Sequence, residues 1–209
     1  MRTYEDLVAE ALAAPVTGRV EYLDGRITEG SPPWSYRGRA DEVTGQANGP
    51  VLDITGEVAE SAGQLPFRDG EFAVVLNHHQ SYEPVEIRRV LREDGMFLTE
   101  QVGGLDGLAI NEALGAPLPD DFSDWALNTA RTGLEEAGLR VANGRTAFPE
   151  RLFHDVGALV YFLRTTPRQV PDFSVERYDK ELRLLYDQMS AGEPFRDRAV
   201  RFLIEAVPA

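Results

Sequence analysis

The feature of this sequence that most constrains its fold is a succession of an apolar run, a short amphipathic segment and a second apolar run within residues 72–102. The first run, FAVVL at residues 72–76, is typical of a strand buried on both faces. Apolar side chains then recur at helical spacing from Pro84, and proline is favoured in the first turn of a helix. An Asp-Gly pair ends that helix, and residues 96–102 are expected to form a second strand. A strand, a helix and a strand joined by short connections make a βαβ unit, which predicts a mostly parallel α/β sheet.

Several motifs in this stretch resemble those of class I S-adenosylmethionine (SAM)-dependent methyltransferases. The family commonly has an FD-hydrophobic run, a VLRPGG turn and an apolar strand, and the corresponding segments here are EFAVVL, VLREDG and MFLTEQV. The segments NHHQSY (residues 77–82) and TEQVGG (residues 99–104) resemble N-R-H-E-x-Y and T-Q-Q-V-G-G of a bacterial, methyltransferase type 11-like subgroup. Relative to that subgroup, His78 replaces an arginine and Glu100 replaces a glutamine.

The resemblance covers most of the chain and implies a Rossmann-like methyltransferase fold. Its longest match is ERLFHDVGALVYFL, residues 150–163, which follows the subgroup's F-H-D-V-G-A-L-V-Y-Y-L segment and is interpreted as one helix. A truncated, mostly parallel sheet is implied, with helices on both faces and an antiparallel last strand at residues 201–206. We therefore expect a single methyltransferase-like domain over residues 1–209, with an N-terminal helix and arm in residues 1–48 and a truncated Rossmann-like core in residues 49–209.

The glycine-rich turn that such methyltransferases place after their first strand is contracted in this sequence. The family pattern is roughly LDLGTGGGE, whereas residues 51–57 are VLDITGE. The chain then continues almost directly to LPFRDG, which resembles the family's approach to its fourth strand, so about one strand-plus-crossover unit is missing. The resemblance implies SAM as cofactor. In the family, an acidic residue at the end of the second strand holds the ribose hydroxyls of SAM, and it has no clear counterpart here. The contracted turn and this missing acid predict that conventional SAM binding is impaired. The candidate cofactor contacts are Asp53, Thr55, Gly56 and Glu57.

The candidate catalytic residues follow the two strands of the βαβ unit. Ligands of open α/β sheets bind beyond the carboxyl ends of the strands, where His78, His79 and Tyr82 are expected. A histidine beside a carboxylate can act as a general base, because its unperturbed pKa of about 6.5 lies near working pH. Glu100 is the candidate carboxylate, although strand alternation places it on the opposite face from Gln101. The alternative for His79 is a turn residue hydrogen-bonded to the backbone.

Other polar and aromatic residues are candidates for contacting a substrate. They are Trp34, Tyr36, Gln101, Asn111 and His154. Three of them have an alternative structural interpretation: Trp34 can pin a surface loop, Asn111 can end a helix, and His154 can be a hydrogen-bonded structural histidine. The spacing of histidines and acidic residues along the sequence predicts no metal site, and no serine lies in a nucleophile elbow.

Composition excludes several classes of protein. The net charge is −14 and the basic residues are scattered, so nucleic-acid binding is not expected. The chain has no cysteine, which fits a cytoplasmic protein, and no apolar stretch approaches the ~20 residues that span a bilayer. The sheet edge left by the missing unit could be covered by self-association, which makes a homodimer the expected assembly.

Three functional hypotheses remain open at this stage. The first is a degenerate SAM-dependent methyltransferase acting on a small molecule. The second is a cofactor-independent enzyme of the cyclase, isomerase or lyase type that reuses the same binding region with a histidine acid/base. The third is a non-catalytic binding protein or partner subunit. The fold alone does not choose among them.

Overall fold

The computed structural model describes residues 2–17, 19–54, 64–118 and 123–209, and the chain forms two compact units. Both units are assembled from separate stretches of sequence. The sheet unit comprises residues 32–104, 124–147 and 200–209. The helical unit comprises residues 1–31, 105–123 and 148–199. The expectation of a single domain over residues 1–209 stays a prediction.

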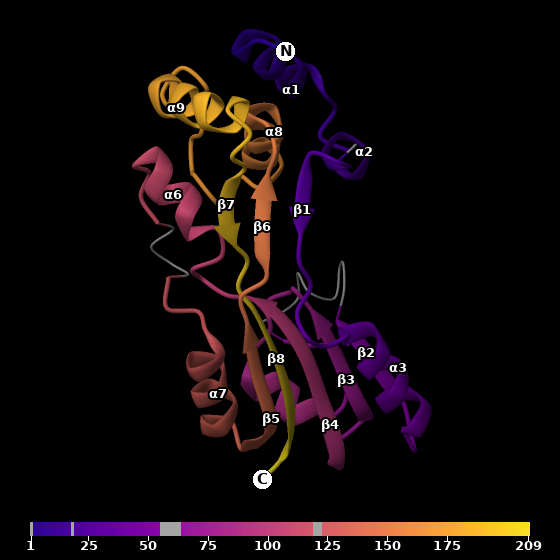
Figure 1. Ribbon diagram of the computed structural model, residues 1–209. Helices are drawn as coiled ribbons and strands as arrows, with labels where there is room; N and C mark the ends of the chain where they lie inside the picture. The colour runs from indigo at the N-terminus through magenta and orange to yellow at the C-terminus, as the bar shows by residue number, and fades with distance from the viewer. Residues whose placement is uncertain (1, 18, 55–63, 119–122) are drawn as a thin grey trace. The chain divides into compact units, whose positions relative to one another are not determined.

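In the described residues, the sheet unit is built on a five-stranded sheet with the order β2-β3-β4-β8-β5. Its strands are β2 (Val51–Ile54), β3 (Phe72–His78), β4 (Leu91–Val102), β5 (Leu139–Ala147) and β8 (Arg201–Pro208) (Figure 1). The strands β2, β3 and β4 pair in parallel, whereas β8 lies antiparallel to both β4 and β5. Four strands therefore share one direction, and the last strand of the chain runs against them. This confirms the predicted α/β class with a mostly parallel sheet and an antiparallel last strand.

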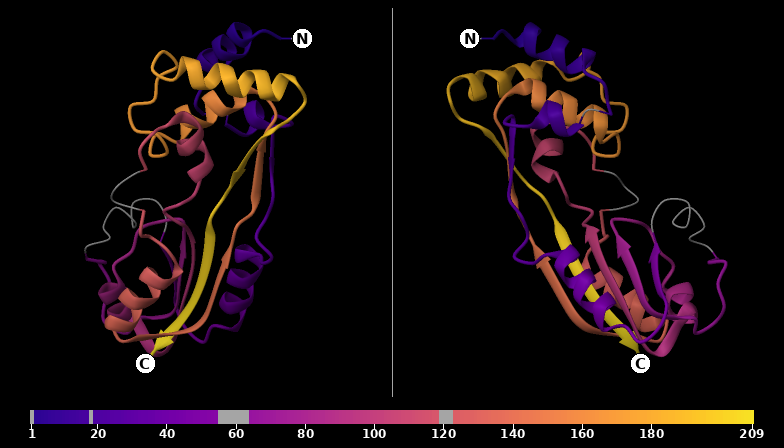
Figure 2. Two further views of the ribbon diagram at one scale, coloured as in Figure 1. Left: turned by 60° about the vertical axis from the view of Figure 1, so that its left-hand side comes forward. Right: turned by 90° about the vertical axis from the view of Figure 1, so that its right-hand side faces the viewer.

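Helices cover both faces of this sheet (Figure 2). They are α3 (Tyr36–Gln46) on one face, and α5 (Pro84–Val90) and α7 (Leu127–Glu136) on the other. Along β3, Val74 and Leu76 pack with α3, whereas Val75 packs with α5 and α7. This is the period of two expected for a strand, so Val74, Leu76 and His78 face the α3 side. Phe72 precedes an irregularity in the pairing with β4 and packs on the α5 and α7 side.

The strand β2 forms one edge of the sheet in the described part of the chain. Its residues pair with β3 in the register Val51 to Val74 and Ile54 to Asn77, and the strand order ends there. An edge at this position is what a missing strand-plus-crossover unit would leave. A homodimer that covers this edge stays a prediction.

The helical unit surrounds a buried helix, α8 (Val156–Thr165). All residues from Val156 to Leu163 are buried, which is the pattern of a helix in the centre of a core. The other helices of this unit are α1 (Tyr4–Ala13), α2 (Arg19–Leu23), α6 (Leu108–Leu114) and α9 (Asp179–Ser190). A three-stranded antiparallel sheet completes it, with the order β1 (Ile27–Glu29), β6 (Glu150–Phe153) and β7 (Phe195–Arg198). No helix in the described residues is long and apolar enough to cross a membrane.

The prediction of one helix over residues 150–163 is wrong at its start. Residues Glu150–Phe153 form β6, in which exposed and buried positions alternate as in a strand. The helix α8 begins only at Val156, and Asp155 is its N-cap, with a side-chain oxygen that accepts the Ala158 N–H at 2.8 Å. The apolar run that follows Asp155 dominated the sequence pattern and hid the short strand before it.

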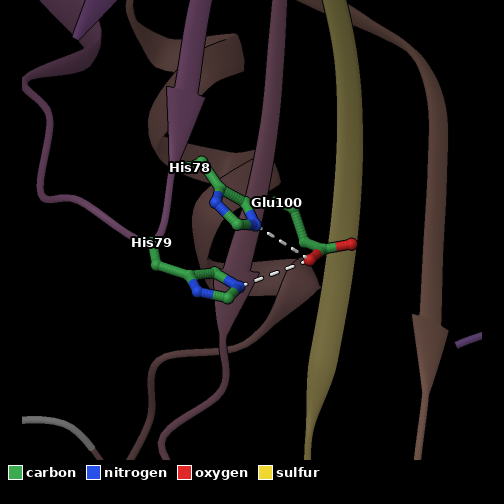
Figure 3. Close-up of side chains that lie close together, drawn as sticks. All are labelled: His78, His79 and Glu100. Carbon is green, nitrogen blue, oxygen red and sulfur yellow. Dashed lines mark hydrogen bonds and ion pairs between the residues drawn. The ribbon is translucent and has the colours of Figure 1, made fainter. Parts of the chain in front are cut away.

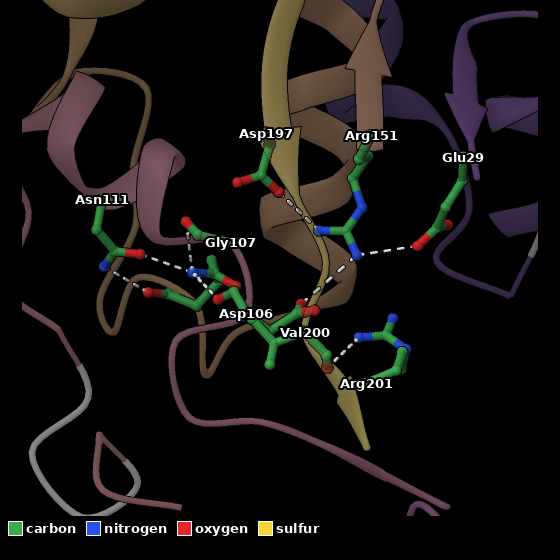
Figure 4. Close-up of polar contacts among 9 residues, drawn as sticks. Glu29, Asp106, Gly107, Asn111, Arg151, Asp197, Val200 and Arg201 are labelled. Carbon is green, nitrogen blue, oxygen red and sulfur yellow. Dashed lines mark hydrogen bonds and ion pairs between the residues drawn. The ribbon is translucent and has the colours of Figure 1, made fainter. Parts of the chain in front are cut away.

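A buried arginine links the strands of the helical unit (Figure 4). The Arg151 side chain is 2% exposed, and its Nη1 lies 3.0 Å from Oδ2 of Asp197. Its Nη2 lies 3.0 Å from Oε1 of Glu29 and 3.5 Å from Oδ2 of Asp106. Burial raises the pKa of Asp197 to about 6, although the positive charge of Arg151 opposes that rise. Three carboxylates thus share one buried guanidinium.

Candidate functional site

The candidate site of the sheet unit lies where β3 ends beside β4. In the parallel register His78, the last residue of β3, is paired with Glu100. Leu76 and Leu98 precede them by two residues and both pack with α3, so His78 and Glu100 project from that same face. The site is therefore at the carboxyl end of the parallel strands, where ligands bind in open α/β sheets.

Two imidazoles converge on one carboxylate oxygen (Figure 3). Nε2 of His78 and Nε2 of His79 each lie 3.3 Å from Oε1 of Glu100. The two rings stack with their centroids 3.9 Å apart. The Glu100 side chain is 9% exposed, whereas those of His78 and His79 are 45% and 34% exposed. The carboxylate is thus shielded while the imidazoles remain accessible.

The backbone of His79 has the left-handed conformation, with a φ of 58°. That conformation is uncommon for residues other than glycine, although histidine is among those enriched there. The His79 N–H donates to the carbonyl oxygen of Glu100 at 2.9 Å, which extends the pairing of the two strands by one residue. This turn brings the His79 ring back over the strand end, beside the ring of His78.

Two aromatic residues hold this cluster, Trp34 just before α3 and Tyr36 at its first position. Nε1–H of Trp34 donates to Oε2 of Glu100 at 2.5 Å. The Tyr36 ring stacks on the His78 ring with centroids 4.5 Å apart. Trp34 and Tyr36, which the sequence suggested as substrate contacts, therefore contact the predicted catalytic residues directly.

The surroundings of the cluster favour the charged form of Glu100 and the neutral form of His78. Burial raises the pKa of Glu100, but hydrogen bonds from His79 and Trp34 outweigh burial and hold that pKa below its ordinary value. Burial lowers the pKa of His78, and the neighbouring His79 lowers it further. Burial also raises the pKa of the Tyr36 phenol, and the negative charge of Asp53 adds to that rise. Asp53 is exposed on β2, and its charge also acts on His78.

A buried amide network lies on the opposite face of the same strands. Oδ1 of Asn77 accepts from Oγ1 of Thr99 at 3.1 Å and from Nε2 of Gln101 at 2.6 Å. Gln101 also donates to the carbonyl oxygen of Gln80 at 3.1 Å, which holds the turn that carries His79. Gln101 therefore contacts this network and not the histidine cluster. Asn77 was not predicted as a site residue, and its signal in the sequence was an amide at the end of an otherwise apolar strand.

Tyr82 lies apart from the cluster. Its ring packs on Phe97 and Trp125, with centroids 5.0 and 6.1 Å away, in the core on the α5 and α7 side of the sheet. Burial raises the pKa of its phenol. Among the described residues its buried hydroxyl has no hydrogen-bond partner, so Tyr82 makes no polar contact with Glu100 or either histidine.

The remaining candidates lie in the helical unit or outside the described residues. Asn111 is 1% exposed and donates to the carbonyl oxygens of Pro117 at 2.7 Å and Gln169 at 2.9 Å, as a structural amide does. His154 is hydrogen-bonded to Oγ1 of Thr28 at 2.8 Å and lines an open hollow of about 270 Å³ with Arg26. The proposed cofactor contacts at residues 55–57 (Thr55, Gly56 and Glu57) lie outside the described residues.

Comparison with known proteins gives matches of structure only. No family model matches the chain, and no curated protein matches its sequence. A proposed methyltransferase from Bacillus halodurans C-125 is 14% identical, with a TM-score of 0.51 over 82% of this chain and 97% of that one. A protein of unknown function from Deinococcus radiodurans R1 is 10% identical, with a TM-score of 0.49 over 92% of this chain and 98% of that one. The [4+2]-cyclase SpnF is 13% identical, with a TM-score of 0.46 over 99% and 97% of the two chains.

These identities are too low to carry an activity from one protein to another, and the Bacillus halodurans likeness bears on the fold alone. The chain has a Rossmann-like fold of the class I methyltransferase type.

Proposed function

We propose that the protein is an enzyme that acts on a small molecule by general acid–base catalysis, with His79 as the principal group and without a conventionally bound SAM. The observation that carries this proposal is the convergence of two accessible imidazoles on the shielded Glu100 carboxylate. Surface histidines that serve only solubility have no need of a buried carboxylate. The position at the carboxyl end of the parallel strands supports the same conclusion.

The proton chemistry follows from which nitrogen faces Glu100. A carboxylate only accepts hydrogen bonds, so Nε2 of His79 carries a hydrogen toward Oε1. In the neutral ring this leaves the lone pair on Nδ1, which can take a proton from a substrate. Glu100 then stabilises the imidazolium, as the carboxylate of a catalytic triad does. The proton returns from Nδ1 to another atom of the same molecule or of a leaving group, which suits an isomerase, a cyclase or a lyase.

Two features of the described residues support the proposed absence of a conventional SAM site. The segment between Ile54 and Phe72 is too short for a strand-plus-crossover unit, which needs roughly 30 residues or more. In the described part of the sheet no strand lies beyond β2 to carry a ribose-binding acid. Asp53 is the one proposed cofactor contact that the structure describes, and a single exposed carboxylate does not make a nucleoside site.

Calorimetric titration with SAM and with S-adenosylhomocysteine tests the cofactor part of the proposal. The expected result is no heat of binding at millimolar ligand, from protein shown to be folded by circular dichroism. Micromolar binding would contradict cofactor independence and would favour the first hypothesis, a small-molecule methyltransferase.

Incubation with a small-molecule cell extract tests the catalytic part. Wild-type protein is compared by mass spectrometry with His79→Asn and with His154→Asn, a matched histidine substitution outside the cluster. We expect a metabolite to change in amount with wild type and His154→Asn but not with His79→Asn. A product heavier by one methylene group would indicate methyl transfer, and no change with any of the three proteins would favour a non-catalytic binder.

A further inference from the structure

We propose that Nε2 of His78, Nε2 of His79 and Oε1 of Glu100 form a binding site for one transition-metal dication of the zinc class. One ligand atom from each of the three residues lies within 4.8 Å of the other two, and each Nε2 is 3.3 Å from Oε1. Zinc binds histidine and carboxylate ligands at about 2.0–2.2 Å, so two ligands of one ion lie roughly 2.8–3.6 Å apart at right or tetrahedral angles. A small movement of the two imidazoles would therefore admit an ion among the three atoms.

The types of ligand select the class of metal. Two imidazoles and a carboxylate suit zinc and its neighbours in the first transition row, whereas magnesium and calcium prefer oxygen ligands. Three protein ligands leave at least one coordination position for water or a small molecule. The partial exposure of His78 and His79 keeps that position open to solvent.

The surroundings of the three ligands resemble the outer shell of a metal site. Ligating carboxylates are generally hydrogen-bonded through their other oxygen, and Oε2 of Glu100 accepts from Trp34. Because Trp34 occupies Oε2, Oε1 is left for the two histidines. The stacked ring of Tyr36 fixes the plane of the His78 imidazole. Asp53 adds negative charge near His78, which favours a cation.

The metal state goes beyond the proposed function, although it uses the same residues. A metal takes the Nε2 lone pair, so the ring hydrogen must lie on Nδ1, and Nδ1 then cannot act as a base. The acid–base state and the metal state of the cluster therefore exclude each other. Metal binding can be measured without any substrate, so its failure and the failure of the catalytic proposal are distinguishable.

The test is calorimetric titration of chelator-treated, dialysed protein with zinc chloride at neutral pH. We expect one zinc ion per chain. The substitutions His79→Asn and Glu100→Gln should each weaken binding by more than about 100-fold, and Trp34→Phe, which keeps all three ligands, by about 10-fold. The matched control His154→Asn should bind zinc as wild type does.

Two results would overturn the proposal. One is the absence of saturable zinc binding by folded wild-type protein. The other is binding that persists in both His79→Asn and Glu100→Gln, or that disappears in His154→Asn. His79 lies in an accessible turn and asparagine also adopts the left-handed conformation, so His79→Asn remains informative even if Glu100→Gln does not fold.

Discussion

Each of the two units shields a carboxylate, but their partners differ in kind. Asp197 of the helical unit, 1% exposed, lies against Arg151, which is itself 2% exposed and shared with Glu29 and Asp106. Glu100 of the sheet unit lies against two half-exposed imidazoles and an indole. A guanidinium is permanently charged and has no lone pair to offer, whereas an imidazole can lose or gain a proton or bind a metal.

The difference separates a structural ion pair from a reactive one. Arg151 and Asp197 are both closed off from solvent, so no substrate or metal ion can reach either partner. Glu100 is shielded, but His78 and His79 present their free edges outward, so protons, metals or substrates can reach the pair. Burial of a carboxylate is thus a weak sign of function by itself. The accessibility of its partner decides whether the pair can take part in chemistry.

The largest expected effect is the loss of stability when the structural pair is broken. Arg151→Met removes the cation that three carboxylates share, and leaving a buried charge without its partner costs about 3–5 kcal/mol. Urea unfolding followed by circular dichroism measures this loss. A loss below about 1 kcal/mol would mean that the pair is not buried in solution. The distinction between this structural pair and the cluster around Glu100 would then not hold.

A smaller change in stability is expected when the pH is lowered, and we attribute it to the protonation of Asp197. Its folded-state pKa of about 6 lies above the ordinary value of 3.8, so the folded protein takes up a proton at a higher pH than the unfolded chain does. The unfolding free energy should therefore rise as the pH falls from about 7 toward 4, by on the order of 2 kcal/mol.

The variant Asp197→Asn should lack this rise, so the quantity to follow is the difference in unfolding free energy between wild type and the variant. Other carboxyls, such as Glu86 beside Arg89, have lowered pKa values and act in the opposite sense at the acid end. A difference that stays flat between pH 7 and 5 would contradict the raised pKa.

For the cluster of Glu100 with the two histidines, the expected loss of stability is smaller still. Glu100→Gln keeps an acceptor for Trp34 and leaves no buried cation unpaired, so the cost is about 1 kcal/mol, the worth of a typical hydrogen bond. Activity on the small molecule should nevertheless disappear. If Glu100→Gln cost as much stability as Arg151→Met, the cluster would be structural and the proposed function would lose its support.

The sequence predicted the parts of the site that depend on local pattern. Apolar runs located β3 and β4, and the period of two placed Glu100 and Gln101 on opposite faces, as the contacts of both residues confirm. Trp34 and Glu100 are 66 positions apart in the sequence, so no local pattern indicates the hydrogen bond between them. The strand at residues 150–153 was missed because four residues beside a strongly apolar helix are dominated by the longer pattern.

The smallest expected effect compares the two residues other than glycine that have a positive φ in the described chain. They are His79, with a φ of 58°, and Asp172 of the helical unit, with a φ of 57°. Glycine relieves left-handed strain, so Asp172→Gly should stabilise the protein by up to about 1 kcal/mol.

In His79→Gly the same relief is offset by the lost contact with Glu100, so the unfolding free energy should stay within about 0.5 kcal/mol of wild type. Parallel urea unfolding of the two glycine variants measures the difference between them. A stabilisation of His79→Gly as large as that of Asp172→Gly would mean that the bond between His79 and Glu100 contributes nothing to the folded state. The placement of the His79 imidazole beside Glu100 would then not explain the left-handed backbone of His79.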